Sequence, residues 1–146
     1  MEIIAGLTAT IAIVALGHAT RQGQSLSFYG SVLIVIALAY VLFAVMAGAP
    51  RTIVVESAIA TGFVGIAVAA TRLENVRMAG VLMAVGLAAH GVYDLVHSAV
   101  VSNPVVPGWW PLFCGVVDIL LGGWLIVLLG RGSLVTPPAE GAVRSS

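Results

Sequence analysis

Hydrophobic residues fill five long stretches of the chain, and short polar segments separate them. The stretches cover residues 3–19, 27–48, 53–71, 78–101 and 110–130. At about 1.5 Å per helical residue, each can cross a hydrocarbon core of about 30 Å when tilt is allowed for. The pattern therefore predicts an all-α, polytopic membrane protein, a bundle of five transmembrane helices.

The composition agrees with this pattern and excludes an ordinary soluble domain. Of 146 residues, 60% are hydrophobic and 8% are charged, and the mean hydropathy is +1.13. We expect one transmembrane domain over residues 1–131 and a disordered cytoplasmic tail over residues 132–146. We found no internal repeat, so an inverted-repeat transporter is not indicated. The expected partners are membrane lipids and not nucleic acid. The sequence leaves open whether the chain forms a homo-oligomer.

Arginines predict the orientation, since the chain contains no lysine. In the alternating polar segments, only Arg51 falls on one side of the membrane. The other side carries Arg21, Arg72, Arg77, Arg131 and Arg144. The positive-inside rule makes this second side cytoplasmic, with the N-terminus outside and the C-terminus inside. The sequence thus predicts a multi-pass protein of the inner (plasma) membrane.

One stripe of the fourth span carries ionisable residues. At 100° per residue, Asp94 lies about 40° and His97 about 20° from His90 around the helix axis. Tyr93 lies about 60° away on the same side. Because a titratable side chain at membrane depth costs about 2.5–3.5 kcal/mol on insertion scales, this stripe indicates a functional site.

Two further carboxylates lie at a similar predicted depth. Counted from the outer ends of their spans, Glu56 lies about 5 Å and Asp118 about 12 Å deep, whereas Asp94 lies about 10 Å deep. Together with the histidines of the fourth span, they would converge in the outer half of the bilayer. We expect a shared cavity there, lined otherwise by small residues.

These carboxylates have no basic partner in the sequence. No Lys or Arg lies inside any span, and Arg51 is about 140° from Glu56 around its helix. A buried carboxylate without a cation must take a proton, pair with imidazolium or bind a metal.

Mixed nitrogen and oxygen donors suit a divalent zinc, iron or manganese ion. The predicted metal ligands are His90, Asp94, His97, Asp118 and Glu56. The predicted catalytic residues are Asp94, Glu56 and Tyr93, although Tyr93 serves equally well as an interhelical hydrogen-bond donor. We interpret Cys114 as a small buried hydrophobe and His18 as an interfacial histidine.

The same region resembles a family of small bacterial integral membrane proteins, domain-of-unknown-function family 6010. The resemblance covers residues 25–128 and is carried by the segment from His90 to His97, by Asn103-Pro104-Val-Val-Pro107, and by Cys114-Gly-Val-Val-Asp118. Glu56 matches an acidic position of that family. Members carry tryptophan where Tyr93 stands and histidine where Ser98 stands. The resemblance implies the architecture and the cluster, but no reaction.

Two function classes fit these residues. The first is a metal-dependent intramembrane enzyme that acts on a lipid or other apolar substrate by hydrolysis or acid–base isomerisation. The second is a proton- or cation-coupled carrier that uses the same cluster, although no titratable group lies in depth between Asp118 and His18 to continue a path. The alternative to both is a non-catalytic membrane protein whose polar residues only pack helices together.

Overall fold

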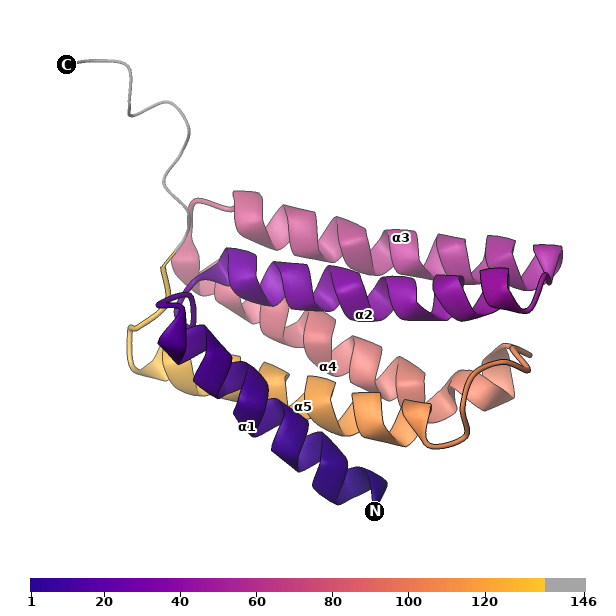
Figure 1. Ribbon diagram of the computed structural model, residues 1–146. Helices are drawn as coiled ribbons and strands as arrows, with labels where there is room; N and C mark the ends of the chain where they lie inside the picture. The colour runs from indigo at the N-terminus through magenta and orange to yellow at the C-terminus, as the bar shows by residue number, and fades with distance from the viewer. Residues whose placement is uncertain (136–146) are drawn as a thin grey trace.

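The computed structural model describes residues 1–135, and within them the chain forms five α-helices (Figure 1). They are α1 (Glu2–Ala19), α2 (Leu26–Met46), α3 (Pro50–Arg72), α4 (Val76–Val100) and α5 (Trp110–Gly130). All five are long and apolar enough to cross a membrane. The predicted all-helical architecture with five candidate spans is confirmed.

The predicted helix bounds differ from the observed ones by three residues at most. The largest difference is at α3, which begins at Pro50 and not at residue 53. Proline suits the first turn of a helix, because its fixed φ is helical and its missing N–H has no partner there. Gly48 makes the preceding turn, with a φ of 58° that side chains rarely adopt.

Helix α4 lies at the centre of the packing. It contacts α2, α3 and α5, and its contact with α5 is the most extensive in the bundle. Helix α1 crosses α5 obliquely and packs chiefly against it (Figure 1). As a result, α4 is the most buried of the five helices and α1 is the least buried.

Glycines allow α4 and α5 to approach closely. A Cβ added at Gly91 would lie 3.0 Å from the Gly115 carbonyl oxygen, and one added at Gly115 would lie 3.1 Å from the Gly91 carbonyl oxygen. Further along, a Cβ at Gly122 would lie 2.9 Å from the Ala84 carbonyl oxygen. Small residues at such positions let helix backbones approach in membranes. The approach brings Asp118 of α5 against α4.

Gly122→Ala is expected to destabilise the bundle relative to Gly123→Ala. A Cβ at Gly123 would meet nothing within 4 Å. Because both substitutions raise the helix propensity of α5 equally, their difference isolates the clash with Ala84. We expect the free energy of unfolding of Gly122→Ala to be lower by about 1–3 kcal/mol, measured by denaturation in mixed micelles. Equal stability of the two variants would contradict the close approach.

The described chain continues in contact with the bundle beyond α5. The Val135 N–H donates to the Gln24 carbonyl at 2.8 Å, and Leu26 N–H donates to the Val135 carbonyl at 3.2 Å. Leu134 is buried against the core. The packed domain therefore extends to Val135, four residues beyond the boundary predicted at residue 131, and the rest of the predicted tail lies outside the described residues.

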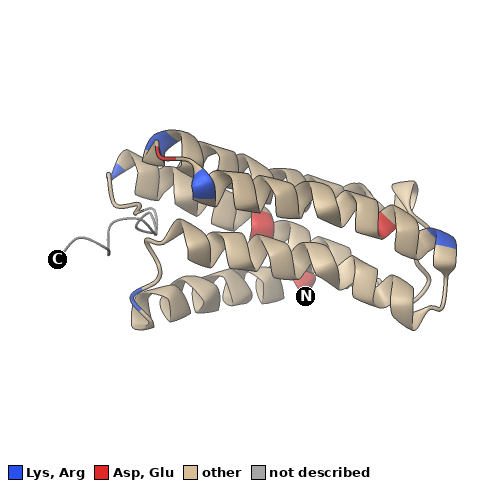
Figure 2. Ribbon diagram, turned by 90° about the horizontal axis from the view of Figure 1, so that it is seen from above, with Lys and Arg blue, Asp and Glu red and all other residues tan. Residues whose placement is uncertain are grey.

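The arginines and the buried acids lie in different parts of the bundle (Figure 2). Among residues 1–135, the arginines all lie at helix ends: Arg51 at one end of the bundle and Arg21, Arg72, Arg77 and Arg131 at the other. Three acids, Glu56, Asp94 and Asp118, lie within the helices and are buried. The buried acids therefore have no arginine beside them along their own helices, apart from Arg51 near Glu56.

Candidate metal centre and polar network

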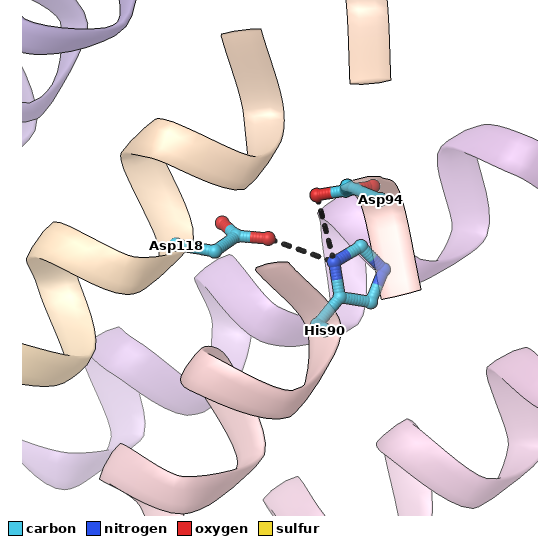
Figure 3. Close-up of side chains that lie close together, drawn as sticks. All are labelled: His90, Asp94 and Asp118. Carbon is cyan, nitrogen blue, oxygen red and sulfur yellow. Dashed lines mark hydrogen bonds and ion pairs between the residues drawn. The ribbon is translucent and has the colours of Figure 1, made fainter. Parts of the chain in front are cut away.

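Three buried side chains of α4 and α5 meet at one nitrogen atom. His90 Nδ1 lies 2.7 Å from Asp118 Oδ2 and 3.5 Å from Asp94 Oδ2. Figure 3 shows both carboxylates approaching the same edge of the imidazole ring. His90 and Asp94 are four residues apart and so share a face of α4, while Asp118 comes from α5. We call His90, Asp94 and Asp118 the inner group.

The inner group has unused acceptor positions. Asp94 Oδ1 accepts a hydrogen bond from the Tyr40 hydroxyl of α2 at 2.7 Å. In contrast, Asp94 Oδ2 and Asp118 Oδ1 are buried and have no hydrogen-bond partner among the described residues. Buried polar atoms are nearly always paired, so an unpaired carboxylate oxygen indicates a water or an ion. Two such atoms in one small group favour a bound ligand.

The spacing of the donor atoms fits a metal ion. One ligand atom from each of the three residues lies within 4.8 Å of the other two. Neighbouring ligands of an ion at about 2.1 Å are about 3.0 Å apart in octahedral and about 3.4 Å apart in tetrahedral geometry. The distances from His90 Nδ1 to Asp118 Oδ2 and Asp94 Oδ2 are 2.7 and 3.5 Å, one below and one above these values. The inner group could therefore hold a metal with small movements of its side chains.

The charge of the inner group also fits a divalent cation. Asp94 and Asp118 are 0% exposed, and His90 is 1% exposed. Two ionised carboxylates carry a charge of −2, and one divalent ion beside a neutral imidazole would make the group neutral. Without a cation, the carboxylates must be protonated or pair with imidazolium to remain buried.

A second cluster lies around Glu56 of α3. Glu56 Oε1 is 2.8 Å from His97 Nε2 and 3.3 Å from Asn103 Nδ2. Glu56 Oε2 accepts a hydrogen bond from the Tyr93 hydroxyl at 2.7 Å. We call Glu56, Tyr93, His97 and Asn103 the outer group, because Asn103 lies in the loop after α4. Here a single carboxylate faces three potential donors.

The structure divides the predicted ligand set between these two groups. Among residues 1–135, the one group of three His, Cys or acidic residues close enough to hold a metal is His90, Asp94 and Asp118. Two other predicted ligands, His97 and Glu56, bind each other. The stripe on α4 was therefore predicted correctly as a buried face, but its two histidines have different carboxylate partners.

Aromatic rings, and not small residues, fill the space around the predicted cluster. Phe63 packs edge-on against His90, with ring centroids 4.7 Å apart. Tyr40 stacks on His97 with centroids 4.0 Å apart and an angle of 16° between the rings. The expectation of a cavity lined by small residues is wrong on this point. Small residues lie where α4 and α5 approach each other closely, and aromatic rings occupy the wider space beside this contact.

Tyr40 connects the two groups, and it was not among the residues predicted from the sequence. Its hydroxyl binds Asp94, its ring covers His97, and its carbonyl oxygen accepts from Asn103 Nδ2 at 3.2 Å. A depth count could have found it: Tyr40 lies six residues before the end of α2, about 9 Å deep, close to the depth predicted for Asp94. Asn103 gave no such signal, because a polar residue in a loop is unremarkable.

The other singled-out residues lie as follows. Cys114 is buried on α5, one turn from Asp118. His18 is exposed at the opposite end of the bundle, where its ring meets Trp124 edge-on at 6.5 Å. His18 is thus separate from both groups.

A pocket opens beside the outer group. It has a volume of about 580 Å³ and lies between the ends of α4 and α5 and the loop that joins them. His97 and Asn103 both line it. The outer group is therefore the part of the network that is closest to the surface.

No family model matches the chain, and comparisons with curated proteins and with solved structures find no match. The resemblance to domain-of-unknown-function family 6010 stays a prediction. The function must be inferred from the site itself.

Proposed function

We propose that this protein is a metal-dependent intramembrane enzyme whose inner group holds a divalent ion and whose substrate is a lipid or another apolar molecule. The observation that carries the proposal is a pair of buried carboxylate oxygens in the inner group, Asp94 Oδ2 and Asp118 Oδ1, that have no hydrogen-bond partner among the described residues. With both carboxylates ionised, packing alone would leave these two oxygens unsatisfied, whereas a bound cation would pair with both.

His90, Asp94 and Asp118 would be the ligands. Two carboxylates and one imidazole suit Mn²⁺, Fe²⁺ or Zn²⁺. Tyr40 would orient Asp94 through its hydroxyl, as hydrogen-bonded neighbours of metal ligands commonly do. A bound divalent ion supplies electrophilic activation to such a reaction.

The outer group would handle protons. Glu56 holds His97 and Tyr93 by hydrogen bonds, which is the arrangement of an acid–base residue with its positioning partners. His97 also lines the pocket, so it is the ionisable member of the network that a substrate in the pocket would meet. Glu56 and Tyr93 keep the catalytic roles predicted for them, and of the two roles predicted for Asp94 the proposal keeps that of metal ligand.

For the orientation, we propose that the arginine-rich end of the bundle faces the cytoplasm of the plasma membrane. This places the N-terminus outside and the α4–α5 loop with its pocket at the outer surface. Alkaline phosphatase fused after Val135 should be inactive, and a cytoplasmic reporter at the same position should be active. The reverse pattern would overturn this orientation.

The enzymatic role is tested by lipid turnover. Purified protein in vesicles of a mixed lipid extract is incubated with Mn²⁺, Fe²⁺ or Zn²⁺, and the lipids are followed by mass spectrometry. We expect one lipid class to be consumed only with metal, and Asp118→Asn to be slower by at least about 100-fold. Unchanged lipids with the metal-loaded protein, or equal turnover by Asp118→Asn, would overturn the proposal.

The complete burial of the inner group favours a second candidate, a cation-coupled carrier. An ion bound at 0–1% exposed side chains would be closed off from both sides until helices move. Metal flux across the vesicle membrane that Asp118→Asn abolishes, with no lipid consumed, would decide for the carrier.

A further inference from the structure

The pocket at the outer end of α4 and α5 has two chemically different sides. One side is polar and consists of His97, Ser98, Ser102 and Asn103. The other side is apolar and includes Leu95 and Leu112, which are 51% and 38% exposed on the helix surfaces. In a membrane, these leucines would lie at the height of the acyl chains below the outer surface. A ligand that fits both sides must be amphipathic.

Asn103, on the polar side of the pocket, has a buried acceptor atom without a hydrogen-bond partner among the described residues. The residue is 8% exposed, and its Nδ2 donates to Glu56 Oε1 and to the Tyr40 carbonyl. Its Oδ1 is buried and has no partner among the described residues. An amide oxygen accepts hydrogen bonds only, so the missing partner must be a donor. Asn103 lines the pocket, so a ligand hydroxyl that reaches this covered atom after a small movement of the lining would be such a donor.

The residues that line the pocket do not favour an anionic headgroup. None of the twelve lining residues is Lys or Arg. Two of the lining residues, His97 and Asn103, are already bound to the carboxylate of Glu56. A phosphate or carboxylate headgroup would therefore find no cation among the lining residues and would lie near a carboxyl group.

We propose that this pocket binds a single-chain amphiphile with an uncharged, hydroxyl-bearing headgroup, the class of 1-monoacylglycerols. A headgroup hydroxyl donates to Asn103 Oδ1, and the acyl chain lies against Leu95 and Leu112. The role of this lipid as substrate rests on the proposed function, whereas its binding does not. The volume of about 580 Å³ accommodates a glycerol headgroup and the first part of a chain.

The test uses fluorescence quenching by a 1-monoacylglycerol with a dibrominated chain. Trp109 and Trp110 lie between the lining residues Gly108 and Pro111, so Trp124→Phe leaves tryptophans only at this end of the bundle. The protein is placed in phosphatidylcholine nanodiscs without added metal. The dibrominated monoacylglycerol is compared with a dibrominated fatty acid and a dibrominated phosphatidylglycerol.

We expect saturable quenching by the monoacylglycerol and weaker, unsaturable quenching by the two anionic lipids. Asn103→Ala should weaken the monoacylglycerol affinity about fivefold to tenfold, as loss of one hydrogen bond predicts. Ser31→Ala, which alters an exposed serine bonded within its own helix, should leave the affinity unchanged. Unsaturable quenching by all three lipids, or unchanged affinity in Asn103→Ala, would overturn the inference.

Two further variants keep the outcome decisive. Val106→Phe fills the pocket and removes no hydrogen-bonding side chain, so it should weaken monoacylglycerol binding. It therefore tests the pocket independently of whether Asn103→Ala folds. Val85→Phe makes the same change at an exposed position of α4 that does not line the pocket, so it should bind the monoacylglycerol like the parent protein. Binding without turnover would contradict the proposed enzyme alone, and turnover of some other lipid without saturable monoacylglycerol binding would contradict this inference alone.

Discussion

Asp118→Asn is expected to lower the affinity of the protein for Mn²⁺, Fe²⁺ or Zn²⁺ by at least about tenfold, since removal even of a ligand's hydrogen-bonding partner costs about 10–100-fold. The asparagine keeps the size of the side chain and an oxygen that can face His90, so the fold should persist. What it loses is the negative charge that balances the ion. Calorimetric titration of the purified protein with the metal ion measures this change in affinity.

Glu56→Gln is the matched control for this variant. It makes the same chemical change at a buried carboxylate of the outer group, 1% exposed. Because Glu56 is bound to His97, Tyr93 and Asn103 and not to the inner group, its metal affinity should stay near that of the unmodified protein. Equal loss of affinity in both variants would show that the ion is shared between the groups, as the sequence alone had predicted.

Glu56→Ala is expected to produce the largest loss of stability. It leaves the Tyr93 hydroxyl and the His97 Nε2 without their partner in the bundle interior. Each orphaned buried group costs about 1–3 kcal/mol, so the free energy of unfolding should fall by at least about 2 kcal/mol. Thermal unfolding in a mild detergent measures the loss.

Glu74→Ala provides the comparison for Glu56→Ala. Glu74 is exposed in the turn between α3 and α4, and surface changes of this kind stay within about ±0.5 kcal/mol. Were Glu56→Ala as stable as Glu74→Ala, the hydrogen bonds of the outer group would contribute nothing to the fold.

The helices were predictable because apolar length is a strong signal in this chain. Hydrocarbon requires that backbone polar groups bond within the helix, so each apolar run of sufficient length must be helical. The buried face of α4 was also predictable, since His90, Asp94 and His97 follow the helical period. Both inferences depend on residues close together in sequence.

The pairing of acids with histidines was not predictable, because it depends on how the helices cross. The depth counts put Glu56, Asp94 and Asp118 in one layer, but they contain no information on which helix faces which. The contacts of Gly91 and Gly115 bring Asp118 to His90. Glu56 reaches His97 from α3, on another side of α4.

Tyr40 contacts both the inner and the outer group. One tyrosine binds a ligand of the inner group by its hydroxyl and covers His97 of the outer group with its ring. A metal bound at the inner group would therefore be one side chain away from His97, which lines the pocket. This contact would couple metal binding to substrate binding in the proposed enzyme.

The most direct test of the account is the metal content of the unmodified protein, purified in a mild detergent at neutral pH and measured by elemental analysis. We expect about one divalent transition-metal ion per chain, lost with a strong chelator and restored by adding the metal back. Thermal stability should fall and recover in step with the metal, because a bound ligand stabilises the folded state. A metal content near zero, together with no stabilisation by added Mn²⁺, Fe²⁺ or Zn²⁺, would contradict the metal centre on which the proposed function rests.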